Sequence, residues 1–125
     1  MLLVDSAVWI DHLRLADADL QMQLDAQGVV GHPLVTGEVA MGSLADRRAV
    51  LTLLQQLPQA VRAEDSEVLT LVEQRMLFSL GLGFVDAHLL ASCLLTPATR
   101  LLTRDRRLHG AAERLGVAAY IPTEP

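Results

Sequence analysis

The sequence predicts an α/β domain in which a parallel sheet is flanked by helices on both faces. Two observations support this prediction. Short apolar runs alternate with helical patterns along the chain. The runs at residues 2–4 and 100–103 are each followed within two residues by an acidic residue, after which a helical pattern begins at once. The chain has 125 residues, of which 51% are hydrophobic, so we expect residues 1–125 to form a single domain.

In the first half of the chain, capping and breaking residues set the limits of the predicted elements. Asp17 and Asp46 are typical helix N-caps. Pro33 separates a short extended piece from the next helix, because the residue before a proline avoids the helical region. The predicted elements are a strand at 2–4, helices at 6–15 and 18–27, a strand at 29–30, and helices at 34–41 and 47–57.

The second half of the chain predicts three more helices and three more extended segments. A stripe of Leu69, Val72, Met76 and Leu80 indicates a helix across residues 67–80. Gly116 stops the last helix. The remaining predicted elements are a strand at 60–63, a helix at 86–95, a strand at 100–103, a helix at 105–115 and a strand at 117–121.

Four acidic residues follow apolar runs or chain breaks: Asp5, Glu38, Asp86 and Asp105. Taken singly, each aspartate is a preferred helix N-cap, and Glu38 is an ordinary surface residue of a helix. Taken together they indicate a site, because ligands of open α/β sheets bind beyond the carboxyl ends of the strands. Four neighbouring anions repel one another, so a divalent cation is their natural partner.

The residue types of this candidate site favour Mg²⁺ or Mn²⁺ as the cofactor. Both ions prefer oxygen ligands, and they can activate a water and neutralise the charge that develops on a phosphodiester. Ser6 and Thr103 stand close to two of the acids in the sequence, where their hydroxyls could bind water or phosphate oxygens. The sequence contains no dinucleotide-binding or P-loop motif that would indicate a different cofactor. The scattered histidines lack zinc spacing; we interpret His32 as a turn residue and His88 as a packing or supporting residue.

Charge and cysteine usage narrow the class of protein. The net charge of −5 argues against a uniformly basic nucleic-acid-binding surface, although not against a nuclease. Arg104 and Arg106 flank Asp105 and could contact RNA phosphates, or could be a solvated helix start. The single cysteine, Cys93, is interpreted as a core residue of a protein in the reducing cytoplasm. No apolar stretch approaches the ~20 residues of a membrane span, and the first residues lack the basic region of a signal peptide.

Four stretches of the chain, each with one of the four acids, carry a family resemblance. They are 3–10 (LVDSAVWI), 32–38 (HPLVTGE), 85–92 (VDAHLLAS) and 102–108 (LTRDRRL). In these stretches the chain resembles the PIN-domain ribonucleases of the VapC type, the toxins of toxin–antitoxin pairs. The resemblance implies a parallel five-stranded sheet between helices, with the four acids as the catalytic and metal-site residues and Ser6 and Thr103 beside them.

The same resemblance implies an activity and partners. We expect Mg²⁺- or Mn²⁺-dependent endonucleolytic cleavage of RNA, often a structured RNA such as tRNA or rRNA. We also expect a homodimer and a VapB-type antitoxin that binds near the site.

Two other classes of function stay open at this point. A phospho-receiver domain has a similar length and clustered acids, but it needs a lysine beside its phosphoaspartate, and all ten basic residues of this chain are arginines. A binding module with the same fold and no catalysis is the second alternative. The presence of all four acids counts against it, because a site that binds no metal has no reason to keep their repulsion.

Overall fold

The computed structural model describes residues 1–120, in which seven helices surround a small parallel sheet. This confirms the α/β class. The strands are β1 (Leu2–Val4), β2 (Val29–Val30) and β3 (Arg100–Leu102). The helices are α1 (Ser6–Arg14), α2 (Ala18–Asp25), α3 (Pro33–Ala40), α4 (Arg47–Gln56), α5 (Asp65–Gln74), α6 (Phe84–Leu95) and α7 (Arg106–Arg114). Within these described residues, no helix is long and apolar enough to cross a membrane.

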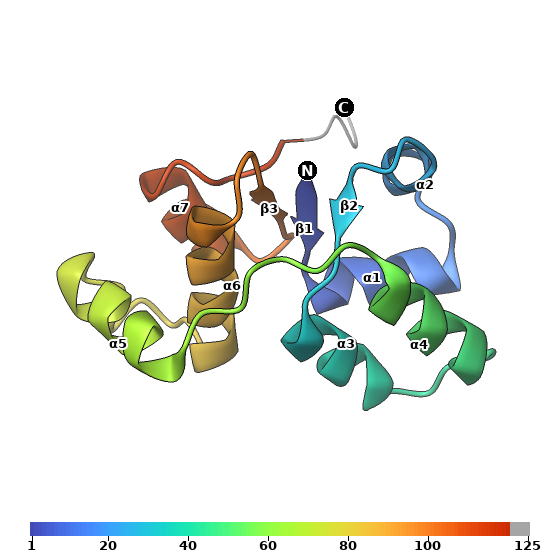
Figure 1. Cartoon of the computed structure of the whole chain (residues 1–125), viewed down its shortest axis with the longest axis horizontal. Coiled ribbons are helices and arrows are strands. Elements are labelled where there is room, and N and C mark those ends of the chain that lie inside the picture. Colours follow the sequence, from blue (N-terminus) through green and yellow to red (C-terminus); the bar gives the residue numbers. More distant parts are fainter. Residues whose placement is uncertain (121–125) are drawn as a thin grey trace.

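The three strands lie in the order β2-β1-β3, and both pairs are parallel. Leu3 of the central strand is paired with Val30 on one side and with Leu101 on the other. In the view of Figure 1, α1 to α4 lie on one side of the sheet and α5 to α7 on the other. Because the strands are parallel, their carboxyl ends meet at one edge, and there they lead into α1, α3 and α7.

The sheet is smaller than the five strands that the sequence predicts. The predicted strand at 117–121 contributes one parallel bridge, between Ala118 and Leu101, and a second bridge joins Gly31 to Gln59, the residue before the predicted strand at 60–63. The pairing with β2 stops there because the next backbone donor on the β2 side would be Pro33, which has no N–H and begins α3. The N–H of Val61 points the other way and donates to the hydroxyl of Thr96 at 2.9 Å. The last residue of the final predicted strand, residue 121, lies outside the described residues.

The helix predicted across residues 67–80 is shorter than expected. α5 ends at Gln74, and Met76 has a left-handed φ of 53°. The N–H of Leu77 then donates to the carbonyl of Val72 at 2.9 Å, which closes the helix end.

The side chains of this segment that face the core also differ from those predicted. Leu69, Met76 and Leu80 were expected to point inward, but they are 57%, 63% and 38% exposed. Val68 is the fully buried residue of the helix, and Val72 is partly buried beside it. The stripe prediction was wrong for three of its four residues. Met76 and Leu80 lie past the end of α5, and within the helix the inner face carries Val68 rather than Leu69.

The limits of the helices around the candidate site are close to those predicted. α6 begins at Phe84 rather than at Asp86, so Asp86 lies in the first turn of the helix and Gly83 is the N-cap. Gly116 takes a φ of 75°, the left-handed conformation that ends α7 as the sequence predicts.

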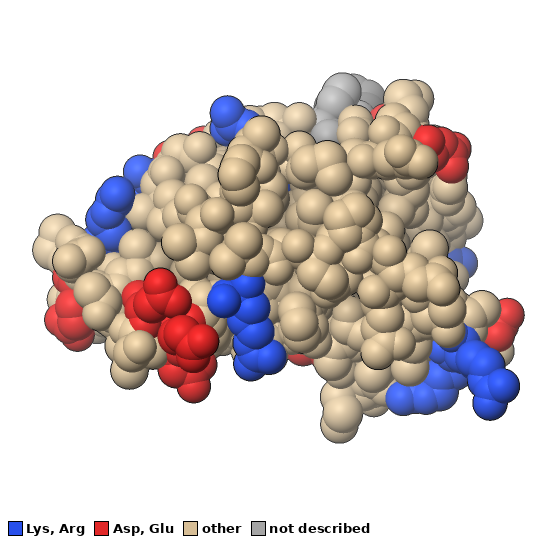
Figure 2. All heavy atoms as spheres, in the orientation of Figure 1, with Lys and Arg blue, Asp and Glu red and all other residues tan. Residues whose placement is uncertain are grey.

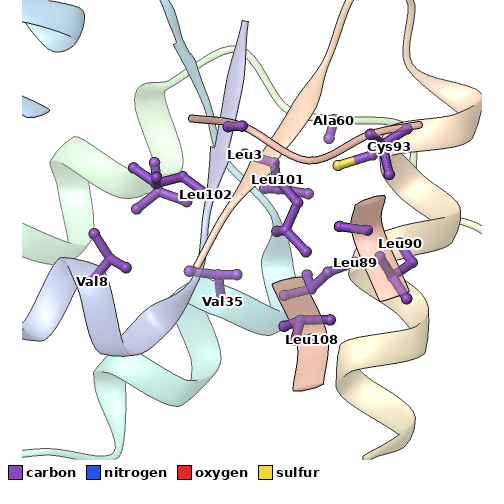
Figure 3. Close-up of a cluster of buried hydrophobic side chains, with 14 of the residues drawn as sticks. Leu3, Val8, Val35, Ala60, Leu89, Leu90, Cys93, Leu101, Leu102 and Leu108 are labelled. Carbon is purple, nitrogen blue, oxygen red and sulfur yellow. The ribbon is translucent and has the colours of Figure 1, made fainter. Parts of the chain in front are cut away.

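The main core packs strand residues against the inner faces of α6 and α7 (Figure 3). Leu3, Leu89 and Leu101 have no exposed surface. Trp9 is also buried in this core. Cys93 is buried, and this burial raises the pKa of its thiol to about 12. The prediction that Cys93 packs rather than reacts is therefore confirmed.

Candidate active site

Asp5 stands at the carboxyl end of the central strand, where it is also the N-cap of α1. Its Oδ1 accepts a hydrogen bond from the N–H of Ser6 at 2.8 Å. Its Oδ2 accepts a hydrogen bond from the hydroxyl of Thr103, also at 2.8 Å. With one donor on each oxygen, the Asp5 carboxylate has a fixed orientation.

Asp105 occupies the equivalent place after the neighbouring strand β3. It is the N-cap of α7, and its Oδ1 accepts from the N–H groups of Arg107 and Leu108 at 2.9 and 3.1 Å. Its own N–H donates to the Thr103 hydroxyl at 3.1 Å. Thr103 therefore links the two strand-end acids, because the same buried hydroxyl accepts from Asp105 and donates to Asp5.

Asp86 reaches the same region from the first turn of α6. Its Oδ2 accepts from the N–H of Gly83 at 2.9 Å, in a capping box at the helix start. Partial burial raises the pKa of this carboxyl, and the negative charges of Asp5 and Asp105 raise it further, while the Gly83 hydrogen bond opposes the change. Asp86 therefore lies within the electrostatic influence of both strand-end acids.

Glu38 approaches from α3 and is the most loosely held of the four acids. Its side chain is exposed. Desolvation raises the pKa of Glu38, a hydrogen bond with the Ser6 side chain lowers it, and the charges of Asp5 and Asp86 raise it again. The structure thus brings all four predicted acids into one electrostatic neighbourhood, from four different elements.

The donor chemistry of this neighbourhood fits a hard divalent cation, although the site is open. Within residues 1–120, no three His, Cys, Asp or Glu side chains are grouped tightly enough to form a ready ligand set. The capping bonds engage one oxygen of Asp86 and one of Asp105, and each carboxylate keeps its other oxygen. Mg²⁺ needs few protein ligands, because it keeps several waters and uses one or two carboxylates.

The arginines near Asp105 differ in what they contact. Arg104 pairs with Asp11 and also with Asp17, the latter at 3.0 Å. Its guanidinium is therefore engaged within the protein, whereas Arg106 is exposed at the start of α7. On the face shown in Figure 2, basic side chains form separate groups rather than one continuous basic surface.

Two histidines, His32 and His88, are buried, and the sequence assigned a lesser role only to His32. His32 is fully buried and hydrogen bonds to Ser92, so its interpretation as a turn residue was incomplete. His88 is also buried, and its Nε2 lies 2.8 Å from Oδ1 of Asp65, as expected for a packing or supporting residue. The available signal for His32 was its place before Pro33, where a histidine can cap the helix that follows.

Comparison with known proteins adds an independent line of evidence. No protein-family model matches the chain. Among curated proteins, it is 49% identical over 118 residues to Ribonuclease VapC32 of Mycobacterium tuberculosis, in the strains CDC 1551 / Oshkosh and ATCC 25618 / H37Rv. The aligned region covers 94% of this chain and 95% of each relative.

The chain belongs to the VapC ribonuclease family. The resemblance carried by the four acid-bearing stretches is therefore confirmed. The roles of the individual residues remain predictions from the sequence, with the geometry described above in their support.

Proposed function

We propose that this chain is the toxin of a toxin–antitoxin pair and acts as a divalent-metal-dependent endoribonuclease that hydrolyses RNA phosphodiester bonds. The observation that supports this most strongly is that four carboxylates, the N-caps of α1 and α7 after β1 and β3 and one residue each on α3 and α6, lie where their charges act on one another. The near-complete alignment with VapC32 ribonucleases supports the same reading.

Asp5, Glu38, Asp86 and Asp105 would hold one or two Mg²⁺ or Mn²⁺ ions. When bound, such an ion activates a water for attack on phosphorus and neutralises the charge that develops on the phosphodiester. The chain's own contribution is orientation. Thr103 and the N–H of Ser6 fix the Asp5 carboxylate, and the helix N-termini fix Asp86 and Asp105.

The substrate and partners follow from the family. We propose a structured RNA, such as tRNA or rRNA, as the substrate and a VapB-type antitoxin as the inhibitor, with the toxin as a homodimer in a PIN-like fold. Of the two nearby arginines, Arg106 is the better phosphate contact, because its side chain is exposed while that of Arg104 is held by two aspartates.

The two alternatives lose support for different reasons. A phospho-receiver lacks its lysine here, since the chain contains none. A binding module without catalysis has no use for holding Glu38 and Asp86 partly desolvated and near other negative charges. Desolvation first, and then those charges, raise the pKa of both carboxyls.

The test is to express the wild type and Asp86→Asn without any antitoxin and to map new RNA 5′ ends after brief induction. Asn keeps the size of the side chain and an oxygen that can accept from Gly83, so the helix start is preserved. We expect growth arrest and a small set of defined new ends for the wild type, and neither for Asp86→Asn. If both proteins slow growth equally and produce the same ends, carboxylate-dependent cleavage is not the cause.

A further inference from the structure

His32 and Ser92 form a hydrogen bond between two fully buried side chains. His32 is the N-cap of α3, and its Nδ1 accepts from the N–H of Leu34 at 3.0 Å. Since Nδ1 is the acceptor, the neutral ring carries its proton on Nε2. That proton is donated to the Ser92 hydroxyl, whose oxygen lies 2.9 Å from Nε2.

This bond joins two helices that each carry one of the acids. His32 precedes the helix that bears Glu38, and Ser92 lies on the helix that bears Asp86. Otherwise α3 packs mainly on α1 and α4, whereas α6 packs mainly on α5 and β3. Among the described residues, the His32–Ser92 bond is the one hydrogen bond that joins α3 or its cap to α6.

We propose that the His32–Ser92 pair is a positioning device that sets the place of Glu38 relative to Asp86, and so tunes the affinity of the site for its metal ion. Neither residue touches the substrate or the ion in this account. The inference rests on the proposed function for the role of the two acids, and it adds a residue pair that acts through them.

The surroundings keep this link in one protonation state. Burial lowers the pKa of His32 to about 4, and the nearby Arg62 and His88 lower it as well. The imidazole is therefore neutral near neutral pH, with one nitrogen as acceptor and the other as donor. A charged ring could not accept from Leu34, so neutrality is a condition for the cap of α3, whereas Nε2 donates to Ser92 in either state.

The competing explanation is that this is a buried hydrogen bond that only stabilises the fold. Both explanations predict a lower melting temperature when the bond is removed. They differ in metal affinity, which a merely structural bond would leave unchanged in the folded protein.

Three variants separate the two explanations. Ser92→Ala removes the hydroxyl. His32→Asn keeps a favoured N-cap for α3 but is too short to reach Ser92. Thr99→Val is the matched control, because Thr99 is buried and its hydroxyl donates to the Pro97 carbonyl at 3.1 Å, before β3 and away from the carboxyl edge.

Mn²⁺ affinity is measured by calorimetry, and kcat and KM for RNA cleavage are measured at a temperature where every variant is folded. We expect Ser92→Ala and His32→Asn each to weaken Mn²⁺ binding about tenfold and to lower kcat more than they raise KM. The double variant should be no worse than either single variant, because both remove the same bond. Thr99→Val should melt lower with unchanged Mn²⁺ affinity.

The inference is overturned if Ser92→Ala and His32→Asn alter Mn²⁺ affinity no more than Thr99→Val does. The proposed function fails separately, if the wild type neither binds Mn²⁺ nor cleaves RNA. If Asp86→Asn abolishes Mn²⁺ binding while Ser92→Ala leaves it intact, only the positioning role is wrong.

Discussion

The two halves of the candidate site are held in different ways. The sheet-edge half consists of Asp5, Thr103 and Asp105, which are joined through one buried hydroxyl and anchored to helix N-termini. The helix half consists of Glu38 and Asp86, which come from helices packed on different neighbours. Both acids of the helix half have raised pKa values, caused first by desolvation and then by the charges around them.

This difference indicates how strongly a substitution in each half should affect the site. The sheet-edge half follows from strand pairing, because β1 and β3 are adjacent and their ends cannot separate without breaking the sheet. The helix half depends on side-chain contacts between helices. We therefore expect the loss of a supporting contact in the sheet-edge half to disable the site outright, and the loss of a supporting contact around the helix half to adjust it.

The largest effect is expected from Thr103→Val, which has a similar shape but no hydroxyl. It removes the donor to Asp5 and the acceptor for the Asp105 N–H. The free energy of unfolding should fall by about 1–3 kcal/mol, because two hydrogen bonds are lost at a buried position, and kcat should fall about 100-fold because Asp5 loses its orientation. Steady-state kinetics measures kcat, and denaturant unfolding measures the free energy of unfolding. Thr103→Ser, which keeps the hydroxyl, should retain most of the activity; equal damage from Ser and Val would mean that the hydroxyl does not matter.

A smaller effect is expected from pH on the helix half in the absence of metal. The raised pKa values of Glu38 and Asp86 mean that the folded protein binds these protons more tightly than the unfolded chain. The free energy of unfolding should therefore fall as pH rises from the ordinary values, 3.8 for Asp and 4.5 for Glu, through the raised ones. We expect a loss of about 0.5–1 kcal/mol, since solvent screens both groups.

Melting in EDTA across this pH range measures the loss, with Asp86→Asn as the comparison. The variant should show a flatter pH profile and should melt higher than the wild type near neutral pH. Saturating Mn²⁺ should restore the melting temperature of the wild type, because a ligand that binds the folded state stabilises it. A wild-type melting temperature in EDTA that rises with pH through the same interval would contradict the predicted direction of the effect.

The smallest effect is expected from the arginines beside the sheet-edge half. Arg104→Ala breaks its pairs with Asp11 and Asp17. Because the Arg104 side chain is 48% exposed and solvent screens its charge, the free energy of unfolding should fall by less than about 1 kcal/mol. Arg106→Ala should leave stability unchanged and raise KM for RNA several-fold, with a weaker salt dependence of binding. If Arg104→Ala raises KM as much as Arg106→Ala does, then Arg104 leaves its aspartates to contact RNA.

The sequence was sufficient for the sheet-edge half because the signals there are local. An apolar run, an acid and a helical pattern follow one another within a few residues, and parallel pairing brings such ends together. Thr103 was also found this way, from its place two residues before Asp105.

Three other features could not be predicted from local sequence signals: the contact between the helices of the helix half, the end of α5, and the extent of the outer strands. The His32–Ser92 bond joins residues 60 positions apart, so no spacing in the sequence indicates it. The end of α5 depends on Met76 adopting a left-handed φ, and because this residue is not a glycine the sequence gives no signal for it. The outer strands were predicted from apolar composition, but a strand also needs a partner with backbone donors, and two residues after Gly31 the partner chain reaches Pro33, which has no N–H.

The central claim is that four acids from separate elements form one metal site, and calorimetric titration with Mn²⁺ tests it most directly. The wild type is compared with Asp5→Asn, Glu38→Gln, Asp86→Asn and Asp105→Asn, each of which removes one charge at nearly constant size. The account predicts that every substitution weakens Mn²⁺ binding, by about tenfold or more for Asp5 and Asp86. It is contradicted if any two of the four variants bind Mn²⁺ as tightly as the wild type.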